Sequence, residues 1–129
     1  MFVCLGNICR SPTAHAILEK KILDENLQHK IIVDSAGTGD WHIGRPPDLR
    51  AQKIALRHNY DLSNLKARQV SFADFYDFDY ILAMDKQNLI DLKAMAPLDF
   101  SGSLQLFLDY GSTDKNEVPD PYIGGEGGF

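Results

Sequence analysis

The chain has 129 residues, of which 44% are hydrophobic and 24% are charged, and this composition suits one globular domain. Thirteen basic against eighteen acidic residues give a formal net charge of -5, which argues against nucleic-acid or anionic-membrane partners because both need a basic face. The longest apolar stretches are too short to span a bilayer, and no basic region of a signal peptide opens the chain. We therefore expect a cytoplasmic protein without membrane insertion.

Short apolar runs alternate with segments of helical periodicity in the first half of the chain. Met1 to Val3 predicts the end of a buried strand, and the apolar spacing after it predicts a helix from about Pro12 to Gln28, with Ser11 as the N-cap. The β-branched run within Lys30 to Asp34 predicts a second strand. The Gly- and Pro-rich segment 35–48 then predicts a loop.

The second half repeats this alternation. Asp48 is a suitable N-cap for a helix over Leu49 to His58, and Asp79 to Met84 predicts a third strand. Asp85 caps a further helix, and Leu104 to Tyr110 predicts a strand for which a helix remains the alternative. The alternation predicts an α/β fold with a parallel sheet and helices on both of its faces.

Both cysteines lie in one loop, "CLGNICRS", which follows the first predicted strand. Cys4 and Arg10 have the spacing C-x5-R, and Gly6 and Asn7 tolerate the positive φ that a tight loop needs. Inward N–H groups, a helix N-terminus and a guanidinium together form a cradle for a phosphate, and they favour a thiolate that attacks it. The predicted phosphate-binding residues are Leu5, Gly6, Asn7, Ile8, Cys9 and Arg10.

Other interpretations of this loop fit less well. Cys4 and Cys9 could be small buried hydrophobes, which is common for free cysteine. A structural disulfide between them fits poorly, because it would close too short a loop. A nucleotide-binding P-loop needs G-K-[ST], which is missing, and the four histidines show no ligand spacing. We therefore expect no metal and no cofactor.

A second segment, "VPDPY" at Val118 to Tyr122, could supply an acid. It follows the last predicted strand, so it can reach the same edge of the sheet, where Asp120 would protonate a phenolate leaving group. A plain surface turn is the alternative for such a composition.

These motifs together resemble the low-molecular-weight protein tyrosine phosphatases. The resemblance rests on "VCLGNICRSP" at Val3 to Pro12 and "DPY" at Asp120 to Tyr122, and it extends to "SAGT" at Ser35 to Thr38 and "DYILAMD" at Asp79 to Asp85. It covers essentially the whole chain. It implies a doubly wound, four-stranded parallel sheet and hydrolysis of phosphotyrosine in proteins, and of small aryl phosphates, through a cysteinyl-phosphate intermediate.

The resemblance also implies the roles of single residues. Cys4 would be the nucleophile, Arg10 the phosphate clamp, Asp120 the general acid and Cys9 the redox partner of Cys4. The residues implied to support the loop are Asn7, Ser11 and Ser35. The residues implied to form the walls of a slot for the aromatic ring are Leu5, Trp41 and Tyr122.

Family members usually have a longer first strand and a final helix after the D-P-Y motif. We expect residues 1–129 to form a single phosphatase domain that is short at its N-terminus and truncated at its C-terminus, without that helix. The expected partners are phosphotyrosine proteins and inorganic phosphate or other oxyanions, with no nucleic acid.

Two alternative functions remain. An arsenate reductase of related fold would use the same C-x5-R cradle but would need cysteines after Cys9, and none follows. A non-catalytic phosphate-binding module would not need Cys4, Arg10 and Asp120 together.

Overall fold

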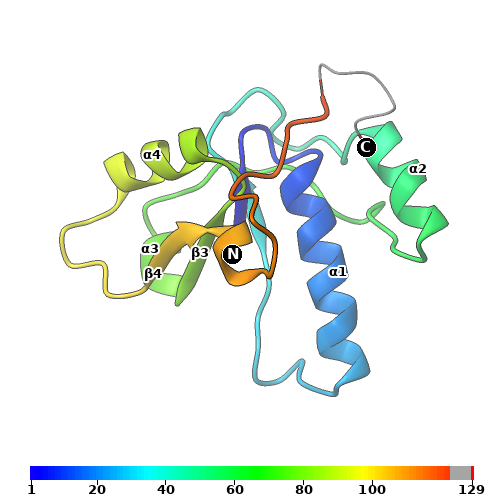
Figure 1. Cartoon of the computed structure of the whole chain (residues 1–129), viewed down its shortest axis with the longest axis horizontal. Coiled ribbons are helices and arrows are strands. Elements are labelled where there is room, and N and C mark those ends of the chain that lie inside the picture. Colours follow the sequence, from blue (N-terminus) through cyan, green and yellow to red (C-terminus); the bar gives the residue numbers. More distant parts are fainter. Residues whose placement is uncertain (123–128) are drawn as a thin grey trace.

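The computed structural model describes residues 1–122 and Phe129, and its centre is a four-stranded parallel sheet (Figure 1). The strands are β1 (Phe2–Cys4), β2 (Ser35–Gly37), β3 (Tyr80–Ala83) and β4 (Ser103–Leu106), in the order β2-β1-β3-β4. The chain runs from β1 first to one side and then to the other, so strand order reverses beside β1. The loop after β1 therefore lies where open α/β sheets bind ligands.

Helices cover both faces of the sheet, as predicted. On one side, α1 (Arg10–Asp24) packs on β1 and β2, and α2 (Leu49–Arg57) lies beyond it (Figure 1). On the other side are the short α3 (Asp74–Asp77) and α4 (Lys86–Met95), which packs on β3 and β4. A 3-10 turn, η1 (Phe107–Tyr110), follows β4. Among the described residues, no helix is long and apolar enough to cross a membrane.

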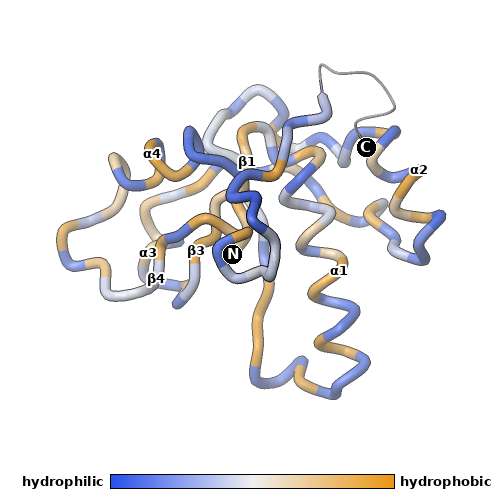
Figure 2. Tube along the Cα trace, in the orientation of Figure 1, coloured by the Kyte–Doolittle hydropathy of each residue, from blue (hydrophilic) through white to orange (hydrophobic). Residues whose placement is uncertain are grey.

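Strand β1 supplies both hydrophobic cores because its successive side chains point to opposite faces. Val3 is fully buried with Ile81 and Leu92 on the α4 face, whereas Phe2 and Cys4 belong to the cluster on the α1 face. The central strands are hydrophobic, and α1 alternates between hydrophobic and hydrophilic positions (Figure 2). Cys4 is thus fixed by the packing of the innermost strand.

The prediction of a second strand within Lys30 to Asp34 was wrong. The strand is β2, which starts at Ser35, and Ile32 in the predicted run is 81% exposed. β2 consists of small residues because it passes close to the loop after β1. A Cβ atom on Gly37 would lie 2.7 Å from the carbonyl oxygen of Leu5, so no larger residue fits there.

The predicted ends of α1 also need correction. The helix begins at Arg10, and Ser11 lies inside its first turn instead of capping it. Its hydroxyl is engaged with Cys4, as described below. The helix ends at Asp24, before the predicted Gln28, because Asn26 adopts a left-handed conformation (φ 56°).

The later elements agree better with the prediction. Asp48 caps α2 and Asp85 caps α4 through side-chain hydrogen bonds, as expected. The predicted strand over Leu104 to Tyr110 is a strand only as far as Leu106 and continues as η1.

Candidate active site

A small slot of about 220 Å³ opens at the carboxyl end of β1. Residues from three distant parts of the chain line it: Cys4, Leu5, Gly6, Ile8, Cys9, Arg10, Trp41, His42, Asp120 and Tyr122. The sequence predicts all of these as site residues except His42. The slot thus combines a thiol, a guanidinium, a carboxyl group and aromatic rings.

Cys4 lies at the end of β1 and is 3% exposed. Two groups contact its sulfur: the Ser11 hydroxyl, with Oγ 3.0 Å from Sγ, and the backbone N–H of Asn7, which donates to Sγ at 3.3 Å. The first turn of α1 lies directly behind the loop. The sulfur of Cys4 is therefore held in place at the N-terminal end of α1, where it lines the slot.

Asn7 holds the loop between Cys4 and Arg10 in its curled shape. Its backbone is left-handed (φ 57°), and its Nδ2 donates to Ser11 Oγ at 2.7 Å. Its Oδ1 accepts from the backbone N–H of Arg68 at 3.0 Å. Asn7 and Ser11 therefore form one buried network beneath Cys4.

Ser35, the third residue expected to support the loop, contacts a different partner. Its hydroxyl lies 3.0 Å from His15 Nδ1, and the other ring nitrogen of His15 is 3.3 Å from Glu19 Oε2. The contact of Ser11 with β2 is to the carbonyl oxygen of Ala36, at 3.4 Å. Ser35 thus joins β2 to α1, and His15 is a support that the sequence did not reveal.

An ion-pair cluster stabilises the position of Arg68 behind the loop. Its guanidinium donates to both carboxylate oxygens of Asp74, at 2.9 and 3.0 Å, and lies 3.0 Å from Asp34 Oδ2. Burial opposes ionisation of Asp74, but the hydrogen bonds from Arg68 and Ser71 outweigh it and lower the pKa of Asp74. The backbone donor that meets Asn7 is fixed by this cluster.

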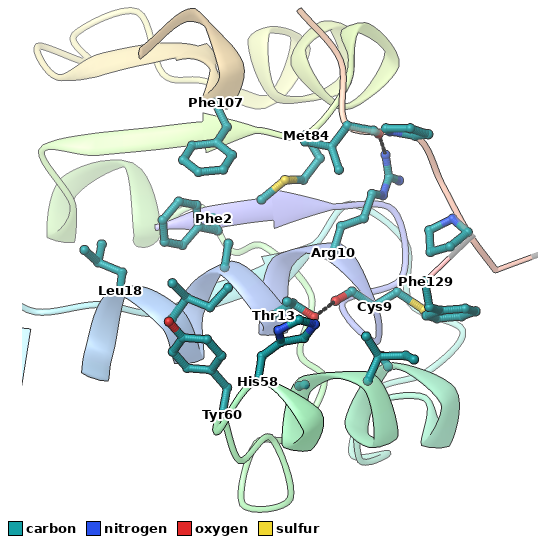
Figure 3. A pocket seen from close by; sticks show the side chains of 18 of the residues that line it. Phe2, Cys9, Arg10, Thr13, Leu18, His58, Tyr60, Met84, Phe107 and Phe129 are labelled. Atoms are coloured by element: carbon teal, nitrogen blue, oxygen red, sulfur yellow. Dashed lines mark hydrogen bonds between the residues drawn. The ribbon is translucent and has the colours of Figure 1, made fainter. Parts of the chain in front are cut away.

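Arg10 points from the first turn of α1 across the end of the sheet. Its Nη1 donates to Asp85 Oδ2 at 2.6 Å and to the carbonyl oxygen of Val118 at 3.0 Å, the second of which is drawn in Figure 3. Its Nη2 lies 3.4 Å from Asp120 Oδ2. The guanidinium of Arg10 and the carboxyl group of Asp120 are therefore close enough to contact the same small ligand.

The Val118–Tyr122 segment, named here the DPY segment, places Asp120 at the rim of the slot. The backbone N–H of Val118 donates to the carbonyl oxygen of Met84 at 2.7 Å, which attaches the segment to the end of β3. Asp120 Oδ1 accepts from the backbone N–H of Tyr122 at 3.1 Å, and the Asp120 side chain is 40% exposed. The carboxyl group is thus held locally while it remains open to solvent.

Leu5, Trp41 and Tyr122 are among the residues that line the slot. Leu5, Trp41 and Tyr122 are 39%, 64% and 42% exposed, so their apolar surfaces remain open to a ligand. Trp41 packs on Gly39, where a Cβ atom would overlap its ring at 1.8 Å. His42 packs edge-to-face on Tyr122, with ring centroids 5.7 Å apart, and its buried Nδ1 has no hydrogen-bond partner among the described residues.

Cys9 differs from Cys4 in its environment. It is buried with Ile8 and Ala67, and Phe129 packs against this cluster. Burial, followed by the nearby negative charge of Asp48, raises the pKa of Cys9 to about 12. Cys9 is therefore a protonated thiol at neutral pH.

A larger groove of about 800 Å³ lies on the α1 face, bounded by α1, α2 and the DPY segment (Figure 3). Its lining is mostly apolar, with Phe2, Met84 and Phe107 on the sheet side and Leu18 on α1 (Figure 3). Arg10 lines both spaces, but Cys4 and Asp120 line only the slot, so we assign the chemistry to the slot. No group of three or more His, Cys, Asp or Glu side chains that could hold a metal ion occurs within residues 1–122 and Phe129.

Comparison with known proteins agrees with this geometry. Residues 1–129 match the sequence profile of the family "Low molecular weight phosphotyrosine protein phosphatase". The chain is 47% identical over 126 residues to the low molecular weight protein-tyrosine-phosphatase YfkJ of Bacillus subtilis, with 97% of this chain and 81% of YfkJ covered.

Solved structures are equally similar. The crystal structure of the protein tyrosine phosphatase of Entamoeba histolytica with Hepes in the active site has a TM-score of 0.92 at 42% identity, over 98% of this chain and 81% of that chain. The Drosophila arginine phosphatase has a TM-score of 0.91 at 43% identity, over 99% of this chain and 83% of that chain. With its whole length matched and a thiol, a guanidinium and a carboxyl group in one slot, the chain belongs to the low molecular weight phosphotyrosine protein phosphatase family.

Proposed function

We propose that this protein hydrolyses phosphotyrosine in proteins, and small aryl phosphates, through a cysteinyl-phosphate intermediate. The observation that carries the proposal is the meeting of Cys4, Arg10 and Asp120 in one slot of about 220 Å³. The similarity to proteins named as protein-tyrosine-phosphatases supports the substrate class.

In the first step, the Cys4 thiolate attacks the phosphorus atom of the bound ester. An S–P bond forms as the bond between phosphorus and the phenolic oxygen breaks, and Asp120 donates its proton to the departing oxygen. Arg10 and the inward N–H groups of the loop stabilise the charge on the phosphoryl oxygens. This step releases tyrosine and leaves phosphate on the cysteine.

In the second step, the Asp120 carboxylate takes a proton from a water molecule that attacks the phosphorus atom. The S–P bond breaks, inorganic phosphate leaves, and the thiolate is restored with its hydrogen bonds from Ser11 and Asn7. The positive charge required in both steps comes from the protein itself, so we expect turnover without a metal ion.

The slot walls favour an aryl ester. A phenyl ring can lie between the apolar surfaces of Leu5, Trp41 and Tyr122, with its phosphate at Cys4. Aromatic walls can also stack on a guanidinium, and one structural relative is an arginine phosphatase, so phosphoarginine is the second substrate to examine. Residues 10–129 contain no cysteine, which disfavours arsenate reduction through a relay of thiols.

Rapid-quench kinetics with p-nitrophenyl phosphate and a phosphotyrosine peptide tests the proposal. We expect a burst of about one phenol per enzyme, a trapped phosphocysteine, and no effect of EDTA. Cys4→Ser should reduce turnover by at least ~10⁴-fold while vanadate still binds, because the cradle remains. Retained turnover in Cys4→Ser, or EDTA inactivation reversed by zinc or magnesium, would overturn the mechanism.

Substrate class is decided in the same assay by a comparison of kcat/KM. We expect a higher kcat/KM for a phosphotyrosine peptide than for phosphoarginine or arsenate. A higher kcat/KM for phosphoarginine would assign the slot to guanidinium phosphates instead.

A further inference from the structure

We propose that Arg50 is a positioning residue for Asp120, because it ties the DPY segment to the same loop that carries Cys4. This inference rests on the proposed role of Asp120 as general acid. Arg50 lies in the first turn of α2, outside the residues that line the slot. It acts through Asp48 on one side and Tyr122 on the other.

Asp48 fixes the direction of the Arg50 side chain. Arg50 Nε donates to Asp48 Oδ1 at 3.0 Å and Nη2 donates to Oδ2 at 2.9 Å, so the ion pair is bidentate. Asp48 Oδ1 also accepts from the backbone N–H of Arg50 at 2.8 Å and thereby caps α2. A planar guanidinium held by two parallel hydrogen bonds has a defined orientation.

Arg50 contacts Tyr122 in two ways. Its Nη2 donates to the carbonyl oxygen of Tyr122 at 3.1 Å, and its guanidinium carbon lies 5.5 Å from the centre of the Tyr122 ring. His42 packs on the same ring edge-to-face. The end of the DPY segment is therefore fixed in both its backbone and its side chain.

Tyr122 helps to fix Asp120, which lies two residues earlier in the chain. Asp120 Oδ1 accepts from the backbone N–H of Tyr122 at 3.1 Å, and Asp120 Oδ2 lies 3.4 Å from Arg10 Nη2. A displacement of Tyr122 would remove one of these contacts and rotate the carboxyl group.

The other end of this chain of contacts is the loop itself. The backbone N–H of Asp48 donates to the carbonyl oxygen of Ile8 at 2.8 Å, and Ile8 is two residues from Arg10. The contacts thus form a closed ring around the slot, which runs Ile8, Asp48, Arg50, Tyr122, Asp120, Arg10. Arg50 is the member that spans from α2 to the DPY segment.

The expected effect is on catalysis more than on folding. Arg50 is 31% exposed, and exposed ion pairs contribute little to stability. A small misplacement of a catalytic group, in contrast, can cost up to ~10²-fold in rate. We expect Arg50→Met to lower kcat/KM about 10-fold for substrates whose leaving group needs a proton, within that limit.

The test is a series of substituted phenyl phosphates of increasing leaving-group pKa, assayed with Arg50→Met, Arg50→Lys and wild type. The loss in Arg50→Met should grow with leaving-group pKa, and vanadate affinity should stay within about twofold. Arg50→Lys keeps the charge but not the planar guanidinium that makes the bidentate contact. Its loss of activity should therefore lie between that of Arg50→Met and wild type. Arg57→Met, an exposed arginine in the last turn of the same helix, is the matched control and should follow wild type.

A cycle with Asp120→Ala separates this inference from the proposed function. If Arg50 acts through Asp120, Arg50→Met should leave the leaving-group dependence of Asp120→Ala unchanged. The role of Arg50 alone is overturned by two results together. The activity of Asp120→Ala depends steeply on leaving-group pKa, whereas both Arg50 variants lose the same activity for every leaving group or lose none. A uniform loss in Asp120→Ala overturns the general acid, and the inference about Arg50 with it.

Discussion

Arg10 Nη1 lies 2.6 Å from Asp85 Oδ2, and this contact joins the first turn of α1 to the N-terminus of α4. Asp85 also caps α4, since its Oδ1 accepts from the backbone N–H of Asn88 at 2.8 Å. The Arg10 side chain is only 4% exposed, so its charge needs a partner. The N-cap of a helix on one side of the sheet thus sets the direction of the Arg10 side chain on the other.

Asp85→Asn should lower kcat/KM about 10-fold, because the amide can still cap α4 but no longer holds a buried guanidinium by charge. Steady-state kinetics and thermal unfolding measure the two effects separately. Asp91→Asn, on the same helix and with the same change in net charge, is the control. Equal kcat/KM in wild type and Asp85→Asn would show that Asp85 serves only as a cap.

Cys9 should react with oxidised Cys4 faster as pH rises. Its pKa is raised to about 12, chiefly by burial, so below that pH the thiolate fraction grows tenfold per unit. We expect disulfide closure, measured by quenched alkylation and mass spectrometry, to accelerate ~10-fold from pH 7 to pH 8 after peroxide treatment at one fixed pH. Cys9→Ser should form no such disulfide and should recover less activity with thiols. A closure rate independent of pH would exclude Cys9 thiolate as the attacking group.

The Asp48–Arg50 pair should make the free energy of unfolding depend on pH in the acidic range. Hydrogen bonds from Arg50 lower the pKa of Asp48 in the folded state, although burial opposes them. A lowered folded-state pKa gives stability that is fully present above the unfolded value of about 3.9 and is lost as pH falls through the folded value. Urea unfolding should therefore show wild type more stable than Asp48→Asn by a constant amount from pH 7 to about 5, and this difference should shrink below about pH 4. A difference that persists unchanged at pH 3 would contradict the assignment.

The parallel sheet could be predicted because alternation of strands and helices leaves few arrangements of the chain. The β-branched run at Lys30 to Asp34 predicts the second strand in the wrong place. Ile32 is instead 81% exposed, and the strand is built from small residues that pass close to the Cys4–Arg10 loop. Local propensity was overridden there by a contact between segments more than thirty residues apart.

The slot was more predictable than the groups that support it. The roles proposed for Cys4, Arg10 and Asp120 depend on residue type and spacing, so the sequence indicates these residues directly. Arg50 and Asp85 act through partners 72 and 75 residues away in the chain. An arginine or an aspartate near a helix N-terminus is common, so neither residue could be recognised before the fold was known.

Asp120→Ala provides the most direct test of the acid, and its effect should depend on the leaving group. A phenolate with a pKa near ~10, like that of tyrosine, needs a proton in the transition state, whereas a more acidic phenol leaves as a stable anion. We expect a loss of ~10²–10⁴-fold in kcat/KM for phosphotyrosine and a progressively smaller loss as the phenol becomes more acidic.

The measurement is a plot of log kcat/KM, which reports the step that releases the phenol, against leaving-group pKa for wild type and Asp120→Ala. Wild type should give a nearly flat line, because proton donation offsets the poorer leaving group, and the variant a steep one. Asp114→Ala, an exposed aspartate six residues earlier, is the control for a change of charge near the slot. Removal of the carboxylate also frees Arg10 Nη2 from its 3.4 Å contact, so vanadate should bind at least as tightly to the variant. Two parallel lines would mean that Asp120 supports structure only, and the DPY segment would then be a surface turn whose carboxyl group takes no part in the reaction.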